Sequence, residues 1–402
     1  MKNEMKSINI PEGWKKEKLI DITTVIMGQS PPSSSYSSID NGIPFLQGNA
    51  EFGHRYPTPK YFTTSPSKIS KKNDVLISVR APVGDININN LECVCLGRGV
   101  AAIRPTNINR NFLFYHLINC KKQFEKAQQG STFKAINSKD IGYLNILMPP
   151  IKEQQKIAEI LTTVDCAIEE TGRIISACEK IKKGLMQELL NYDVPPKGWK
   201  KELLTDNTEI LLSNVDKKVK DNEHKVLLCN YMDVYNNEYI TNNMTFMKAT
   251  ASQNEIDKFS LKKGDIIITK DSETQEDIAK STAVIDELKN VLCGYHLALI
   301  RPNQKKINSV FLSKIFESKR IHNYFVRKVN GITRFGLNQS TIKQAHIIFP
   351  PLQEQERIAE IFLTIDKYID EEKEKKETLT TLKKSLMQKL LTGEIRVKVQ
   401  AQ

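Results

Sequence analysis

Basic, amide, hydroxyl and tyrosine side chains occupy the polar loops of this 402-residue chain. Side chains of these types can read the base edges of DNA or hold its phosphates. The candidates are Gln29, Ser33, Tyr36, Arg55, Lys68, Arg80, Arg98 and Lys134 in the first half, and Lys217, Lys218, Lys270, Tyr295, Arg327 and Arg334 in the second. Each of them alone could be an ordinary surface residue, and Arg80 and Arg98, which lie beside turns, could be structural.

No motif for bond-making chemistry is complete. Ser30-Pro31-Pro32 approaches the [Asn/Asp/Ser]-Pro-Pro-aromatic loop of a DNA methyltransferase, but Ser33 stands where an aromatic ring would stack on the base. Residues 97–102 fit the loose G-x-G-x-x-[G/A] pattern, which needs a helix to follow, whereas Arg104-Pro105 follows here. The sequence has no Walker A, H-E-x-x-H or G-x-S-x-G motif. We therefore expect no catalytic residue, no metal site and no cofactor in this chain.

The net charge of +12 indicates a polyanionic partner, with nucleic acid the first candidate. Residues 151–190 and 352–391 each carry −1, so the remainder of the chain carries +14. A basic surface confined to that remainder would suit DNA binding. Charge alone leaves a merely basic protein as an equal alternative.

Cysteine usage and hydropathy point to the cytoplasm. The seven cysteines are odd in number and irregularly spaced, and Cys93 and Cys95, the only close pair, have no second pair or nearby histidine to complete a zinc site. We expect them to be reduced. No apolar run approaches the 18 or so residues that cross a bilayer, and the N-terminus lacks the apolar core of a signal peptide. We therefore expect no membrane partner.

Two duplicated segments must position these loops. Residues 151–190 and 352–391 align without a gap at a spacing of 201, and Pro-Pro precedes each. Proline suits the first turn of a helix but not its interior. Apolar residues recur at steps of three and four, at Ile157, Leu161, Val164, Ile168, Ile174, Cys178, Ile181, Leu185 and Leu189 in the first segment and Ile358, Phe362, Ile365, Ile369, Leu379, Leu382, Leu386 and Leu390 in the second. The spacing predicts two helices, each about 60 Å long.

A helix of that length with a narrow apolar stripe needs a partner helix, so we expect the two to pack against each other. The alternative is that each helix docks on its own globular domain. Gly172 and the charged run 371–377 weaken the middle of both helices, so the contact should be best at the two ends.

The repeat extends into the regions before the helices. Residues 11–17 return as 196–202, residues 71–78 as 262–269, and residues 97–105 as 294–302, while the loops between them differ in length and sequence. Such a pattern is typical of two copies of one reader with different targets. We expect strands at 74–79, 91–96, 141–148 and their repeats, and helices at 111–126 and 309–327. The fold class is therefore α+β, with a curled sheet and one or two helices per copy.

The duplicated P-P-[I/L]-x-E-Q-x-x-I-A-E-I segment, the repeated P-x-G-W, and the closing K-K-x-L-M-Q-x-L-L resemble the specificity subunit of type I restriction-modification systems across nearly the whole chain. The resemblance implies two target recognition domains at 1–148 and 193–349. It also implies two conserved spacer helices at 149–192 and 350–402, the latter with a C-terminal tail. The helices would be antiparallel and form a coiled coil with pseudo-two-fold symmetry.

The resemblance further implies that this chain is not an enzyme. Its partners would be double-stranded DNA, two modification (methyltransferase) subunits and the restriction/translocase subunits. S-adenosylmethionine, ATP and magnesium would bind those subunits rather than this chain. Each recognition domain would read one half of a bipartite site, and the helices would set the spacer and dock the methyltransferase subunits. A stand-alone or cryptic DNA-modifying enzyme and a coiled-coil assembly protein without a DNA role remain as alternatives.

Overall fold

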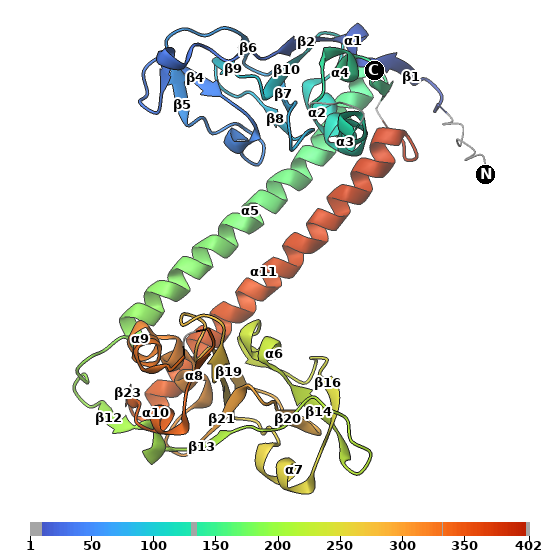
Figure 1. Ribbon diagram of the computed structural model, residues 1–402. Helices are drawn as coiled ribbons and strands as arrows, with labels where there is room; N and C mark the ends of the chain where they lie inside the picture. The colour runs from blue at the N-terminus through green and yellow to red at the C-terminus, as the bar shows by residue number, and fades with distance from the viewer. Residues whose placement is uncertain (1–9, 130–134, 332, 399–402) are drawn as a thin grey trace. The chain divides into compact units, whose positions relative to one another are not determined.

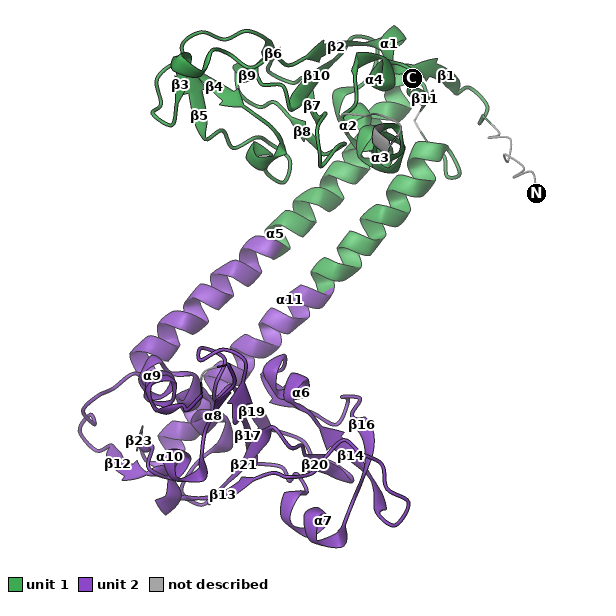
Figure 2. Cartoon of the chain, in the orientation of Figure 1, with its two compact units in different colours: residues 1–171, 375–402 green, residues 172–374 purple. Residues whose placement is uncertain are grey.

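The computed structural model describes residues 10–129, 135–331 and 333–398 and divides into two compact units (Figures 1 and 2). Unit 1 comprises Met1–Thr171 and Lys375–Gln402, and unit 2 comprises Gly172–Glu374. Both units contain part of each long helix, α5 (Ile151–Leu190) and α11 (Leu352–Thr392). No helix in the described ranges is long and apolar enough to cross a membrane. The domain limits expected from the sequence stay predictions.

Unit 1 is a mixed fold with three sheets. Its elements before α5 are β1 (Lys15–Lys18), α1 (Leu19–Ile22), β2 (Thr23–Met27), η1 (Ser33–Ser35), β3 (Tyr36–Ser37), β4 (Ile43–Leu46), η2 (Asn49–Glu51), β5 (Tyr61–Thr63), β6 (Ile69–Lys71), β7 (Val75–Ser78), β8 (Ile86–Ile88), β9 (Cys93–Leu96), β10 (Val100–Pro105), α2 (Arg110–Asn119), α3 (Lys121–Gln129), α4 (Ser138–Gly142) and β11 (Asn145–Met148). The sheets have the orders β2-β10-β7-β8, β3-β5-β4-β9-β6 and β1-β11.

Unit 2 repeats this plan with additions. Its elements between α5 and α11 are β12 (Lys200–Leu203), η3 (Leu204–Asp206), β13 (Thr208–Leu212), β14 (His224–Cys229), α6 (Tyr231–Tyr235), β15 (Tyr239–Ile240), β16 (Met247–Ala251), α7 (Gln253–Phe259), β17 (Ile266–Thr269), β18 (Asp271–Ser272), β19 (Ser281–Val284), β20 (Val291–Cys293), β21 (Leu297–Pro302), α8 (Ser309–Glu317), α9 (Lys319–Lys328), β22 (Phe335–Gly336), α10 (Gln339–Lys343) and β23 (His346–Phe349). The order β13-β21-β17-β19 corresponds to β2-β10-β7-β8, and β12-β23 corresponds to β1-β11. The predicted mixed α+β fold is thus confirmed.

The expected last strand of each unit begins later than predicted. Residues 138–142 and 339–343 instead form the short helices α4 and α10. The side chains of Asn137 and Asn338 cap these helices by accepting backbone N–H groups of the first turn, which stabilises a helix start against a strand. The predicted helices 111–126 and 309–327 are confirmed, but each is divided in two, at Cys120 and at Ser318.

Two repeated sequence features hold the units together internally. Arg104 at the end of β10 forms a bidentate pair with the buried Asp74, and Arg301 pairs with the buried Asp265 in the same way. The glutamine of each P-P-x-x-E-Q motif is also buried. Gln154 accepts the backbone N–H of Asn109, the residue that caps α2, at 2.8 Å. In the same way, Gln355 accepts the backbone N–H of Asn308, the residue that caps α8, at 2.9 Å.

The long helices pack against each other and also enter the cores of the units. In unit 1, Ile157 and Leu161 of α5 share a buried cluster with Met387 and Leu390 of α11. Unit 2 has a corresponding buried cluster, which contains Leu190 of α5 and Ile358, Ala359 and Phe362 of α11. Three further residues of α5 pack against this cluster: Leu185, Met186 and Leu189. The two arrangements weighed from the sequence are therefore compatible, and the expected pairing of the helices is confirmed.

A buried aspartate on each long helix joins three elements. In unit 1, Asp165 of α5 forms an ion pair with Lys383 of α11 at 2.6 Å and accepts a hydrogen bond from Tyr115 of α2 at 2.7 Å. In unit 2, Asp366 of α11 pairs with Lys182 of α5 at 2.6 Å and with Lys314 of α8 at 3.1 Å. Asp165 and Lys182 recur 201 residues later as Asp366 and Lys383, so the same contact occurs twice.

The charged groups around Asp366 shift one another's pKa values toward the ionised forms of Lys314 and Glu238. Burial alone would lower the pKa of the fully buried Lys314, but Glu317, Glu238 and Asp366 raise it above its usual value. Burial likewise opposes ionisation of Glu238, yet Lys314 and Lys182 lower its pKa to about 2. Burial raises the pKa of Glu317 to about 7, so the attraction in this group is mainly that of Lys182 and Lys314 for Glu238 and Asp366.

We expect Asp366→Asn to lower the free energy of unfolding of unit 2 by about 3–5 kcal/mol, because Lys182 and Lys314 lose a buried partner. Trp199 lies in unit 2 and the only other tryptophan, Trp14, lies in unit 1. Denaturant unfolding followed by the fluorescence of Trp199, in a Trp14→Phe background, measures this change.

The matched control is Glu371→Gln, which removes one charge from an exposed pair of the same helix and should change stability by less than about 0.5 kcal/mol. Equal effects of the two substitutions would contradict the importance of the buried pair.

Candidate nucleic-acid interface

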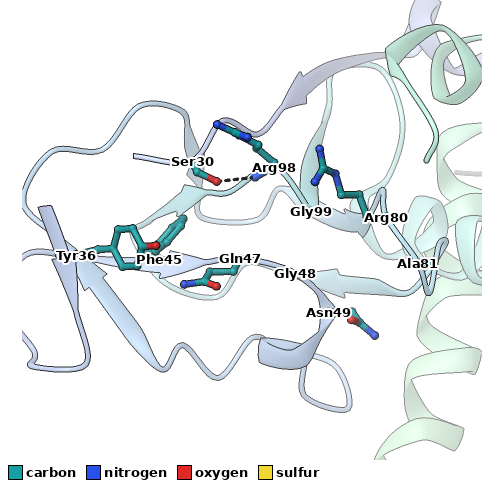
Figure 3. Close-up of a pocket in the computed structure, with 10 residues that line it drawn as sticks. All are labelled: Ser30, Tyr36, Phe45, Gln47, Gly48, Asn49, Arg80, Ala81, Arg98 and Gly99. Carbon is teal, nitrogen blue, oxygen red and sulfur yellow. Dashed lines mark hydrogen bonds between the residues drawn. The ribbon is translucent and has the colours of Figure 1, made fainter. Parts of the chain in front are cut away.

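Unit 1 contains an open cleft of about 280 Å³ at the ends of its central strands (Figure 3). It is lined by Ser30, Tyr36, Phe45, Gln47, Gly48, Asn49, Arg80, Ala81, Arg98 and Gly99. In Figure 3, Arg80 and Arg98 extend to the same side of the cleft, and Tyr36 and Phe45 lie at its other end. The cleft therefore offers two exposed guanidinium groups, two amides and an aromatic surface.

Three backbone segments meet at this cleft. β4 pairs with β9 in parallel, and the turn that follows β9 is anchored because Gly97 donates its N–H to the carbonyl of Leu46 at 2.8 Å. Gly99, two residues later in the same turn, accepts the N–H of Val79 at its carbonyl at 2.9 Å, which places Arg80 beside the turn. A Cβ atom on Gly97 would lie 2.8 Å from the carbonyl oxygen of Leu46, so only glycine allows this close approach.

The arginine side chains of the cleft are exposed, whereas its aromatic side chains pack against each other. The backbone N–H of Arg98 donates to Ser30 Oγ at 3.3 Å, while its guanidinium is exposed. The ring of Tyr36 packs on Phe45, with 4.9 Å between ring centroids. The arginines can therefore adjust to a ligand over a fixed aromatic base.

Unit 2 contains a larger cleft of about 950 Å³. Its lining consists of Tyr231, Met232, Tyr235, Asp271, Ser272, Glu273, Thr274, Asp277, Tyr295, His296, Asn330, Arg334, Phe335, Gly336, Leu337 and Asn338. The rings of Tyr231 and Tyr235 stack, and the hydroxyl of Tyr235 donates to Asp277 at 3.0 Å, which raises the pKa of that tyrosine. This cleft is more acidic and more aromatic than its counterpart.

One carboxylate organises the centre of the cleft in unit 2. Asp271 Oδ2 lies 2.6 Å from Lys270 Nζ and 2.9 Å from His296 Nδ1. Lys270 Nζ also lies 4.9 Å from the centroid of the Tyr295 ring. Lysine, aspartate, histidine and tyrosine thus form one connected group.

The two clefts occupy equivalent places in the two units. β14 pairs with β20 in parallel, as β4 does with β9, and Gly294 donates to the carbonyl of Cys229 at 2.9 Å. His296 accepts the N–H of Lys270 at 3.0 Å, as Gly99 accepts that of Val79. The repeated scaffold therefore presents different side chains at the same positions.

Six of the predicted residues lie at these clefts. Tyr36, Arg80 and Arg98 line the cleft of unit 1, and Tyr295 and Arg334 line that of unit 2, with Lys270 bonded to its lining. Gln29 and Lys68 are exposed and lie nearby, since backbone bonds join both to Leu96.

The other predicted residues are not brought to the clefts. Arg55 is turned inward, with a side chain 13% exposed, and contacts Asp165 and Tyr115. Exposed positions elsewhere are occupied by Ser33, Lys217, Lys218 and Arg327, of which Arg327 lines a separate cleft with Arg320 and Lys328. Lys134 lies outside the described residues.

Several lining residues were not among those predicted. Gln47 and Asn49 in unit 1, and Asp271 and His296 in unit 2, belong to polar loops visible in the sequence. The signal that could have found them is the repeat itself, because the turn 97–99 aligns with 294–296. Strand β10 follows the first of these turns rather than a helix. Within the described ranges, no group of three or more His, Cys, Asp or Glu side chains could hold a metal ion.

Residues 11–179 and 196–381 match the family described as "Type I restriction modification DNA specificity domain". A protein of Methanocaldococcus jannaschii named "Putative type I restriction enzyme MjaX specificity subunit" is 44% identical over 185 residues. That alignment covers 45% of this chain and 43% of the relative, so it spans less than half of either protein. The MjaVIII specificity subunit of the same organism is 23% identical over 411 residues, covering 98% of this chain and 96% of the relative.

A solved structure has a similar fold. The S subunit of a type I restriction-modification system from M. genitalium aligns with a TM-score of 0.63 and 16% sequence identity, over 97% of this chain and 98% of that chain. At this identity the likeness concerns the fold alone, and it agrees with the duplicated plan described above.

We expect Gly294→Ala to destabilise unit 2 by about 1–3 kcal/mol, because the added Cβ would lie 2.6 Å from the carbonyl oxygen of Cys229. Unfolding followed by Trp199 fluorescence measures the change. Gly184→Ala is the matched control in the same unit. Its Cβ meets nothing within 4 Å, and alanine in a helix should raise stability by up to about 1 kcal/mol. A neutral Gly294→Ala would mean that the turn is not fixed by its neighbour.

Proposed function

Because the chain belongs to the type I restriction-modification DNA specificity family, we propose that each of its two domains reads one half of a bipartite site in double-stranded DNA. A specificity subunit recognises DNA and is not the catalytic component of its complex. The stand-alone DNA-modifying enzyme considered from the sequence is therefore set aside.

The observation that carries this proposal is the equivalence of the two clefts. The residues that form the scaffold are shared, whereas the residues that line the clefts differ in charge and size. Two readers that use the same fold meet the DNA backbone in the same way, and their different side chains select different bases. The half-sites should therefore differ in sequence.

The long helices are proposed to set the number of unread base pairs between the half-sites. α5 runs without interruption over 40 residues and α11 over 41. The apolar stripe and the repeated aspartate–lysine pair oppose sliding of one helix along the other, because a slip would leave buried charges without partners.

The partners are proposed to be two modification subunits, joined by restriction/translocase subunits, acting on DNA in the cytoplasm. S-adenosylmethionine, ATP and magnesium would be supplied by those subunits. The long helices offer two equivalent docking positions, since Ile181 of α5 and Leu382 of α11 are 201 residues apart and are 57% and 44% exposed. Both were expected in the buried stripe. An exposed apolar side chain at the same place in two repeats suits one partner bound twice.

Half-site and spacer should change independently. We expect exchange of residues 14–148 for the corresponding domain of another family member to change one half-site only. Inserting four residues after both Glu170 and Glu371 should lengthen each helix by about 6 Å. Because DNA rises by about 3.4 Å per base pair, the spacer should grow by about two base pairs, and both half-sites should stay unchanged. Mapping methylated bases in the genome of a host that carries each variant measures both outcomes. A domain exchange that altered both half-sites would refute independent reading.

Ile181→Glu and Leu382→Glu should each remove one modification subunit from the complex, because a carboxylate placed in an apolar contact opposes docking. The double variant should lose both copies. Native mass spectrometry of the purified complex measures the stoichiometry. Ser176→Glu and Thr381→Glu add the same charge at exposed positions of the same helices and should leave two copies bound. An unchanged stoichiometry in the double variant would exclude this docking surface.

A further inference from the structure

The position that follows the central strand carries opposite charges in the two units. Arg80 follows β7 and forms an isolated bridge with Ala135, while Asp271 follows β17 and pairs with Gly336. Both bridges join equivalent residues, because the sequence repeat relates 80 to 271 and 135 to 336. The same point of the scaffold thus presents a guanidinium in one cleft and a carboxylate in the other.

Opposite charges at one position argue against a phosphate contact shared by both units. Two readers that share a fold approach the sugar-phosphate backbone in the same way, and the phosphates carry the same negative charge in every sequence. A carboxylate at a phosphate would be repelled, and nothing would be gained by placing it there in one copy. A side chain at this position is therefore suited to the base edges, whose donors and acceptors change with sequence.

Asp271 is held in a fixed orientation. Within the part of the chain that the structure describes, Lys270 Nζ and His296 Nδ1 both contact Oδ2. The carboxylate can therefore accept a further hydrogen bond at Oδ1 without giving up those two contacts. Lys270 also offsets the negative charge of Asp271, which reduces its repulsion from nearby phosphates. These features suit a side chain that accepts one hydrogen bond at a defined point.

The hydrogen-bonding groups on the base edges indicate which base suits a carboxylate and which suits a guanidinium. In the major groove, cytosine presents only the N4 amino donor, whereas adenine presents its N6 amino donor next to the N7 acceptor, which a carboxylate would oppose. Guanine presents the N7 and O6 acceptors that arginine binds with two hydrogen bonds.

We propose that Asp271 accepts a hydrogen bond from the N4 amino group of a cytosine in the half-site read by unit 2. Arg80 donates to a guanine at the corresponding position of the other half-site. The inference rests on the proposed function, since it requires that the two clefts face DNA. It adds the identity of one base in each half-site and the residue that reads it.

The test uses the complete complex and duplexes that carry its mapped site. Asp271→Asn should lower affinity about five- to hundredfold and relax the base preference at one cytosine of one half-site. Replacing that cytosine by N4-methylcytosine, which still pairs with guanine but loses the N–H in the major groove, should weaken the wild-type complex to a similar extent. The same base should have little further effect on Asp271→Asn, because the two changes remove one contact. Arg80→Ala should relax the preference for a guanine in the other half-site only.

Glu287→Gln removes an exposed charge from the same unit and should leave affinity and preference unchanged. Trp199 fluorescence establishes that Asp271→Asn folds, and the unaffected first half-site provides a second check. If Asp271→Asn keeps both half-sites and their preferences intact, or relaxes both equally, the assignment of Asp271 is wrong although the bipartite function stands. If the wild-type complex shows no bipartite site, the proposed function itself fails.

Discussion

A buried ion pair between the two long helices is the contact on which the rest of the structure depends. Asp165 with Lys383, and Asp366 with Lys182, each join a helix to its partner, and Tyr115 or Lys314 joins the same carboxylate to the domain helix beside it. A buried charge pair adds little stability compared with apolar packing, but it penalises any arrangement that separates the partners. The pair is therefore suited to fixing the register of the two helices, which apolar side chains alone enforce weakly.

The same division between fixed and variable residues runs through both units. Several charged residues that the repeat preserves are buried and bonded. Asp74 with Arg104, and Asp265 with Arg301, tie strand ends together. By contrast, residues 80 and 271 differ between the repeats and lie at the clefts. Because buried polar pairs fix the scaffold, the residues that line the clefts can change without loss of the fold. Two domains that share a fold can therefore carry different side chains for different sequences.

Periodicity predicted the parts of the fold whose order is local. The proline-bounded stripe predicted both long helices, and the β-branched runs predicted β7 and β17. The stripe misplaced Ile181 and Leu382, because periodicity assigns a face and cannot tell whether a partner within the chain covers it. The short helices α4 and α10 were missed because the Asn137 and Asn338 caps outweigh the strand propensity of the residues that follow.

The candidate site was harder to predict because it depends on contacts between distant segments. Arg55 and Arg98 are both arginines in polar loops, yet one is drawn inward by Asp165, which lies 110 residues later, and the other is left exposed at a turn. Composition cannot separate these two cases. The repeat helps for Arg98, which aligns with Tyr295, because a residue that reads sequence should differ between the copies while its backbone position is kept. Asp271 satisfies that rule beside Arg80, but an acidic side chain is not among the basic, amide, hydroxyl and tyrosine types that composition predicts at a DNA interface.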